Sequence, residues 1–227
     1  MRPLVKICGL MRAEDARMCF RHGTDIVGCV VDYPRPVPWN LGVDAAREIL
    51  FAVKEQSASG EQGEKPPAET CVVTGGERGA VLRIASTLAP NYIQLHCNET
   101  LEDTAYFVRE LGKHNIKIIK TIFPNTPDPE KAAADFSAVG VYALLFDPRT
   151  PDNAGHGGNA DIAAFHRLQR AAGCPVIIAG GITPENAAEI ARQSGASILD
   201  LMTGVEKTSG VKDEERVAAL FAALRDI

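Results

Sequence analysis

The sequence lacks the features that mark membrane, secreted and nucleic-acid-binding proteins. No apolar run approaches the roughly 20 residues of a membrane helix. The apolar run near the N-terminus is interrupted by Lys6 and is too short for a secretory signal. The net charge of −5 argues against nucleic acid as the main partner, because phosphate backbones select basic surfaces. We therefore expect a cytoplasmic protein that binds neither a membrane nor nucleic acid.

The cysteines lack any spacing that would bind a metal or form a disulfide framework. There are six of them, but no C-x-x-C pair and no Cys/His cluster occurs, so we expect no metal site. Most are predicted to be reduced thiols in the core, where a free cysteine packs like a small hydrophobic residue. Cys8 is the candidate exception, because it directly follows the first strand-like run.

A glycine-rich dinucleotide fingerprint is also absent. The first turn reads Cys8-Gly9-Leu10-Met11-Arg12, which does not have the G-x-G-x-x-G spacing of an open, doubly wound sheet. That spacing would have supported the open sheet as the main alternative to a closed barrel. Its absence favours the closed barrel.

What the sequence does contain is a regular alternation of short β-branched runs and longer amphipathic stretches. The runs are 4–8, 25–31, 70–74, 92–96, 116–121, 141–146, 175–179 and 197–201. The stretches are 13–21, 43–54, 77–88, 101–113, 129–136, 161–171, 184–193 and 213–224. Strands that alternate with helices pair in parallel, and eight such units close a barrel. We predict one TIM (β/α)₈ barrel domain over residues 1–227, with 56–68 as a surface insertion of linker composition.

Two candidate catalytic residues stand at the ends of predicted strands, where this fold builds its active sites. Cys8 ends the first strand and Asp147 follows the sixth, so the two face each other across the barrel mouth. A thiol can act as a base if its surroundings favour the thiolate, and a carboxyl group can act as an acid if desolvation keeps it protonated. The plain alternatives are a core thiol and an aspartate that caps a loop.

Glycines after the last two predicted strands indicate a phosphate site. Gly180 and Gly181 follow the seventh strand, and Thr203 and Gly204 follow the eighth. Glycines let backbone N–H groups approach an anion, and paired loops at these positions form the common phosphate site of the fold. We also predict that Thr183 caps the following helix, with Pro184 at its first position. The alternative is that the glycines only make tight turns.

Five segments, in order, resemble the motifs of phosphoribosylanthranilate isomerases. Residues 5–10, VKICGL, are similar to K-I-C-G-[LI]-T, and residues 93–96, IQLH, resemble V-Q-L-H-G. Residues 147–161 resemble D-x-x-x-P…G-G-[TS]-G-x-x-F-D-W, and residues 179–186, AGGITPEN, resemble A-G-G-L-x-P-E-N-V. Residues 200–213 resemble D-V-S-S-G-V-E…G-x-K-D. The resemblance extends from residue 4 to about residue 224.

The resemblance implies an Amadori rearrangement in tryptophan biosynthesis. Asp147 would be the general acid that opens the furanose ring, and Cys8 the general base that removes the C2′ proton. Neither a metal nor an organic cofactor would be needed, because the iminium formed on ring opening accepts the electrons. The substrate would be a small phosphorylated sugar amine, with its phosphate near Gly180, Gly181, Thr203 and Gly204. Gly155 and Gly157 belong to a loop that would contact it.

The aromatic side of the implied substrate site departs from the family pattern. The resemblance implies an arginine after the second strand that binds the anthranilate carboxylate, and counting back from the following helical segment, 44–47, places Pro38 there. Arg35, three residues earlier, is the candidate replacement, because a guanidinium can bind a carboxylate from more than one direction. A sister isomerase for another phosphoribosyl amine and a non-catalytic phosphosugar-binding barrel remain the alternatives. Either a monomer or a homodimer is compatible with the sequence.

Overall fold

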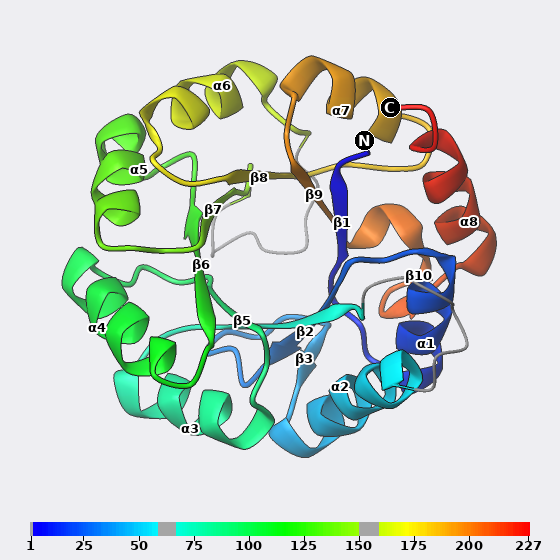
Figure 1. Ribbon diagram of the computed structural model, residues 1–227, viewed down its shortest axis with the longest axis horizontal. Coiled ribbons are helices and arrows are strands. Elements are labelled where there is room, and N and C mark those ends of the chain that lie inside the picture. Colours follow the sequence, from blue (N-terminus) through cyan, green and yellow to red (C-terminus); the bar gives the residue numbers. More distant parts are fainter. Residues whose placement is uncertain (1, 59–66, 150–158) are drawn as a thin grey trace.

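The computed structural model describes residues 2–58, 67–149 and 159–227, and in it a ring of parallel strands is surrounded by helices (Figure 1). The ring closes because β1 pairs on one side with β9 and on the other with β2. This confirms the predicted (β/α)₈ barrel. The barrel strands are β1 (Leu4–Ile7), β2 (Ile26–Val31), β4 (Glu69–Thr74), β5 (Tyr92–Leu95), β6 (Lys117–Ile122), β7 (Ala143–Phe146), β8 (Val176–Ala179) and β9 (Ile198–Leu201).

All eight predicted strands form, with bounds that shift by at most two residues. The helices form as well, because each has an apolar face and several have a capping side chain at their start. Thr100 begins one of them with a reciprocal capping box to Asp103, and Asp213 caps another. The helices are α1 (Ala13–His22), α2 (Val43–Ala58), α3 (Arg78–Leu88), α4 (Leu101–Gly112), α5 (Pro129–Ala138), α6 (Ile162–Ala171), α7 (Ala187–Ser194) and α8 (Glu214–Ala223).

The predicted start of α7 is wrong. Thr183 does not cap this helix, which begins only at Ala187. The side chain of Asn186 instead accepts a hydrogen bond from the backbone N–H of Thr183 at 2.8 Å and donates to the carbonyl of Gly181 at 2.9 Å. These local bonds hold Thr183–Asn186 as a turn, because asparagine competes with the helix for backbone partners.

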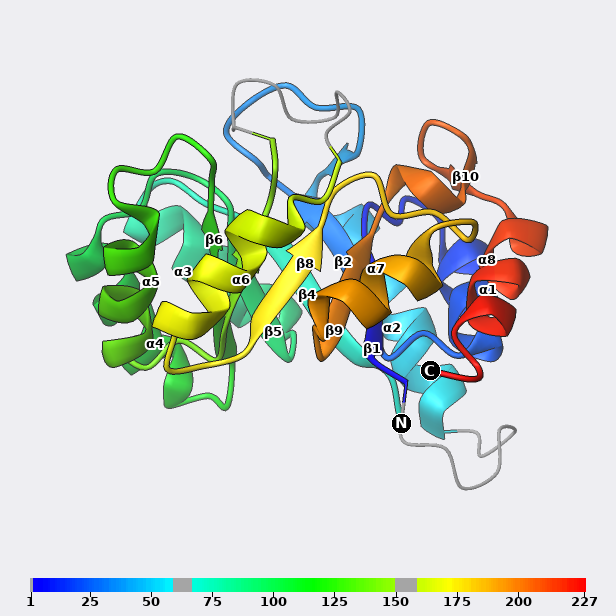
Figure 2. The same cartoon turned by 90° about the horizontal axis from the view of Figure 1, so that it is seen from above.

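Three short strands were not predicted, and all of them lie at the mouth of the barrel. β3 (Asn40–Leu41) adds to the edge of β2, while β10 (Glu206–Thr208) and β11 (Val211–Lys212) form an antiparallel hairpin after β9. Figure 2 shows the β10 hairpin on the face opposite the chain termini. These segments are too short to show a hydrophobic period, so their pairing depends on tertiary contacts.

The buried apolar residues form three clusters that divide the barrel into zones. One fills the space between strands and helices, and a second fills the interior, with Ile119, Leu145 and Ile177 among its members. The third lies at the mouth and contains Cys8, Val30, Tyr33, Trp39 and Val73. The interior is therefore packed, and the space for a ligand is at the C-terminal mouth.

Part of the predicted insertion at 56–68 lies outside the described residues. Its first three residues belong to α2, and residues 59–66 are not described. No helix within the described ranges is long and apolar enough to cross a membrane.

Candidate active site

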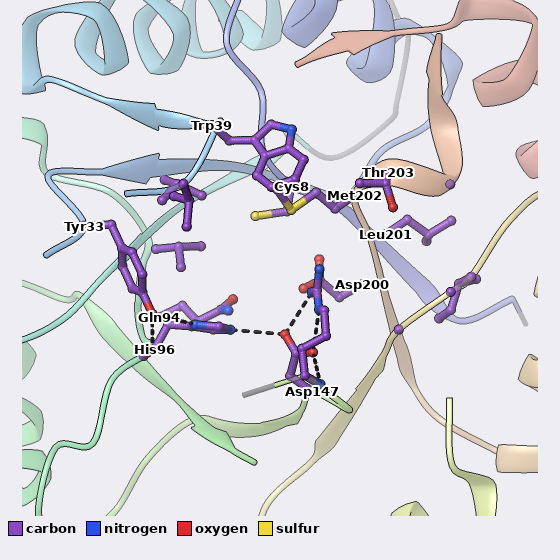
Figure 3. Close-up of a pocket in the computed structure, with 18 residues that line it drawn as sticks. Cys8, Tyr33, Trp39, Gln94, His96, Asp147, Asp200, Leu201, Met202 and Thr203 are labelled. Carbon is purple, nitrogen blue, oxygen red and sulfur yellow. Dashed lines mark hydrogen bonds and ion pairs between the residues drawn. The ribbon is translucent and has the colours of Figure 1, made fainter. Parts of the chain in front are cut away.

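A cavity opens at the mouth of the barrel, and all six residues predicted for catalysis and phosphate binding line it. These residues are Cys8, Asp147, Gly180, Gly181, Thr203 and Gly204. Figure 3 shows Cys8 and Asp147 facing the cavity from opposite sides. Sequence reasoning did not assign a role to the other lining residues, which come mainly from the loop after β2 and from the strand ends. Among them are Tyr33, Val37, Trp39, Gln94, Arg149, Asp200 and Met202.

Cys8 is held at the end of β1 by the backbone. Its N–H donates to the carbonyl of Leu201 at 2.8 Å, and the residue is 4% exposed. Gly28 on β2 makes room for the thiol, since a Cβ there would lie 3.0 Å from Cys8 Sγ. Gly9 then turns the chain with φ +67°, a conformation that favours glycine.

An ion pair lies close to Cys8 in the barrel interior. Lys6 Nζ lies 2.9 Å from Asp200 Oδ1, and the lysine side chain is fully buried. Burial alone would lower the pKa of Lys6, but Asp200, with a further contribution from Cys8, outweighs it and raises that pKa above its ordinary value. The ammonium group of Lys6 near the thiol is therefore charged, and Asp200 neutralises it.

Asp147 is a buried carboxylate with two side-chain partners. Arg149 holds it with a fork, Nε to Oδ1 at 2.8 Å and Nη2 to Oδ2 at 2.9 Å. His96 Nε2 lies 3.1 Å from Oδ2, and the dashed lines in Figure 3 converge on this carboxylate. An ionised carboxylate only accepts hydrogen bonds, so His96 is the donor in this contact.

This arrangement contradicts the expectation that desolvation keeps Asp147 protonated. Burial does raise the pKa of Asp147, but the hydrogen bonds from His96 and Arg149 outweigh it and hold that pKa well below its ordinary value. The sequence analysis weighed burial without the two donors, because it did not predict that both would contact the same carboxyl group. In this arrangement the carboxyl group of Asp147 is therefore ionised.

Tyr33 positions His96 from the loop after β2. Its hydroxyl donates to the carbonyl of His96 at 2.8 Å and lies 3.3 Å from Nδ1. Phe123 packs edge-on against the same imidazole, with ring centroids 5.1 Å apart. The ring orientation that brings Nε2 to Asp147 is therefore set by contacts on several sides.

The predicted phosphate loops meet closely. A Cβ on Gly204 would lie 1.9 Å from the carbonyl oxygen of Ile182, so only glycine fits where the two loops touch. Gly180 and Gly181 have φ of +100° and +60°, which lets the chain turn sharply after β8. The loops thus expose backbone to the cavity on the side of β8 and β9.

Another part of the cavity lining is aromatic and apolar. Trp39, Tyr33, Val37 and Met202 line it, and they cluster with Cys8. Trp39 is anchored from behind, because its Nε1 donates to Glu206 Oε1 at 2.9 Å.

The three remaining predicted site residues are not among the described lining of this cavity, for two different reasons. Arg35 does not belong to its described lining, so the structure does not support this residue as the anthranilate anchor. Its charge acts instead near Tyr33 and Cys97. Gly155 and Gly157 lie outside the described residues. Over those same described ranges, no group of three or more His, Cys, Asp or Glu residues is placed to hold a metal ion.

The comparisons with known proteins agree with this geometry. A family model described as N-(5′-phosphoribosyl)anthranilate (PRA) isomerase matches residues 43–223. The chain belongs to this isomerase family. Among the curated relatives, an N-(5′-phosphoribosyl)anthranilate isomerase of Methanopyrus kandleri is 30% identical, over 98% of this chain and 99% of its own. One from Rhodospirillum rubrum is 31% identical, over 98% of both chains.

Solved structures of phosphoribosylanthranilate isomerases share the fold. The enzyme from Thermus thermophilus superposes with a TM-score of 0.78 at 30% identity, over 98% of both chains. The one from Thermotoga maritima gives a TM-score of 0.80 at 23% identity, over 99% of this chain and 100% of the other, and supports the fold alone.

The cavity of this chain has few basic side chains. Pro38 stands where the family pattern has the arginine after the second strand, and it is exposed. Arg149 is the only arginine or lysine among the described lining residues. Sequence reasoning passed over Arg149, although it follows Asp147 by only two positions. The absence of a cation at position 38 could have pointed to it. If the substrate is an anion, another residue has to supply that positive charge.

Proposed function

We propose that this protein isomerises N-(5′-phosphoribosyl)anthranilate to 1-(2-carboxyphenylamino)-1-deoxyribulose 5-phosphate, in tryptophan biosynthesis. The observation that carries the proposal is the cavity at the barrel mouth, whose lining combines glycine loops with aromatic and apolar side chains. Cys8 and Asp147 face each other across it. This combination suits a molecule with a phosphate at one end and an aryl group at the other. We further propose that residues 1–227 act as one barrel domain.

Asp147 is proposed as the acid and Cys8 as the base. Protonated Asp147 gives its proton to the ring oxygen as the C1′–O bond breaks, and the nitrogen lone pair forms the C=N bond of an iminium. The Cys8 thiolate then removes the C2′ proton, and that electron pair reduces the iminium to an enolamine. A proton returns to C1′ and one leaves the C2′ hydroxyl, which gives the ketone with no net gain or loss of protons. General acid and base groups contribute roughly 10²- to 10⁴-fold each.

The test is turnover of freshly made phosphoribosylanthranilate, followed by the loss of its fluorescence. Wild type is expected to convert it, while Asp147→Asn and Cys8→Ala are each expected to lose about 10²-fold or more in kcat. Retained binding of ribose 5-phosphate by each variant shows that the site is folded. No conversion by a folded wild type that still binds ribose 5-phosphate contradicts the proposal and favours another phosphoribosyl amine as substrate. Full activity in Asp147→Asn contradicts the acid role.

A further inference from the structure

The cavity contains a mismatch between its charges and those of the proposed substrate. The substrate carries two anionic groups, a phosphate and an aryl carboxylate. The described lining carries two carboxylates, Asp147 and Asp200, against one guanidinium, that of Arg149. Asp200 is compensated from within the barrel by Lys6 at 2.9 Å. Among the described lining residues, an entering carboxylate therefore finds a permanent side-chain cation only at Arg149.

Arg149 is placed and shaped for such a ligand. Its side chain is 17% exposed, so the guanidinium is largely withdrawn from solvent but not sealed from the cavity. It already holds one carboxylate in the bidentate geometry that a substrate carboxylate would also fit. Burial would lower the pKa of Arg149, but Asp147 outweighs it, helped by Asp200 and Cys8, and the guanidinium stays charged.

We propose that Arg149 binds the aryl carboxylate of the substrate, in place of the arginine that position 38 lacks, and that it releases Asp147 when it does so. This inference rests on the proposed function, because the carboxylate belongs to that substrate. The guanidinium exchanges one carboxylate for another, so its charge remains paired in both states. Asp147 keeps the contact with His96 and the hydrogen bond from the backbone N–H of Arg149 at 3.0 Å, and it loses the fork. Substrate binding and preparation of the acid are thereby one event.

The physical gain lies in the protonation of Asp147. With Arg149 in place, the buried carboxyl group remains ionised and has no proton to give. Without the fork, the cost of burying a charge is less fully offset, so the pKa of Asp147 rises and protonation becomes easier. The free enzyme keeps its acid stabilised as an ion pair, and the enzyme with substrate has a proton donor opposite Cys8.

The experiment measures the dissociation constants of two ligands for wild type and for two variants, Arg149→Gln and Arg35→Gln. The ligands are reduced 1-(o-carboxyphenylamino)-1-deoxyribulose 5-phosphate and its phenylamino counterpart without the carboxylate. For wild type, loss of the ligand carboxylate is expected to weaken binding roughly 10- to 100-fold, the range of hydrogen bonds to charged groups. For Arg149→Gln the two ligands are expected to bind alike. Arg35→Gln, the matched variant for the other candidate arginine, is expected to keep the wild-type ratio.

Each departure from this pattern overturns the proposal. An unchanged ratio in Arg149→Gln, or a ratio lost in Arg35→Gln, removes Arg149 as the carboxylate site. If Arg149→Gln weakens ribose 5-phosphate by the same factor, the guanidinium serves the phosphate instead. Should Arg149→Gln fail to fold, Arg149→Lys keeps the charge without the fork and is expected to show a reduced ratio, so an undiminished ratio there is equally decisive.

The release of Asp147 has a readout of its own. Calorimetry in buffers of different ionisation enthalpy counts the protons that wild type takes up with each ligand. More protons are expected with the carboxylate ligand than with its counterpart, and equal uptake contradicts the release. Failure of the proposed function is distinguishable, because it shows as a lack of wild-type turnover without any variant.

Discussion

Lys6 on β1 and Asp200 on β9 are register partners in the closing strand pair and form an ion pair of 2.9 Å inside the barrel. The seam at which the barrel closes therefore carries a charge pair beside the proposed base. A buried charge without a partner is costly. The ion pair therefore affects both the stability of the β1–β9 pairing and the surroundings of Cys8.

Lys6→Met is expected to lower the free energy of unfolding by up to about 3–5 kcal/mol, because it leaves Asp200, whose side chain is only 11% exposed, without its partner. The double variant Lys6→Met/Asp200→Asn is expected to recover part of this loss. Urea unfolding followed by circular dichroism measures both. Arg47→Gln, which removes the exposed pair with Asp44, is the control and is expected to have no measurable effect. A Lys6→Met variant as stable as wild type contradicts the argument.

Glu206→Gln is expected to loosen Trp39 and to raise KM several-fold, with a smaller change in kcat. Glu206 accepts from the Trp39 indole at 2.9 Å and from the buried Lys212 ammonium at 2.8 Å, so its charge fixes the indole on the cavity wall. A neutral amide weakens both bonds, since charge-assisted hydrogen bonds are about twice as strong as neutral ones.

Trp39 is the single tryptophan of the chain, so its fluorescence anisotropy reports on this wall alone. Lower anisotropy in Glu206→Gln is expected together with the higher KM. Glu185→Gln, an exposed position paired with Arg216, is the matched control. A raised KM with unchanged anisotropy would mean that Glu206 acts by another route.

Asp147 is expected to contribute stability that disappears in acid. Its pKa is lowered in the folded protein, so the contribution is complete above the unfolded value of about 3.9 and falls by about 1.4 kcal/mol per pH unit below it. The charged and titratable groups around it are His96 and Arg149 in contact, with Asp200 and Cys8 beyond Arg149.

The measurement is the difference in unfolding free energy between wild type and Asp147→Asn from pH 6 down to pH 3. Histidines are ordinarily protonated below about pH 5, and the other carboxylates cancel in the difference. The difference is expected to be constant between pH 5 and about pH 4 and to shrink below it. A difference that grows on acidification contradicts the ion-paired state of Asp147.

The sequence by itself determined the barrel and the positions of its reactive groups. A strand-like run followed by a helix-like stretch recurs eight times. Because helices connect the parallel strands, the C-terminal ends of all eight strands lie at the same end of the barrel. Cys8 and Asp147 therefore had to face each other, and the glycine loops after β8 and β9 had to be neighbours. These positions follow from the local sequence pattern and from the order of strands and helices, both of which can be read from the sequence.

Only the tertiary structure decided which groups touch. Arg149 and His96 are 53 residues apart, yet both hold Asp147, and this contact reverses the protonation expected from burial alone. Trp39 is fixed by Glu206, 167 positions away, and Arg35 turned out to lie outside the cavity lining. Side-chain direction and long-range pairing depend on how loops fold back over the mouth, and no periodic pattern encodes that, because loops have none.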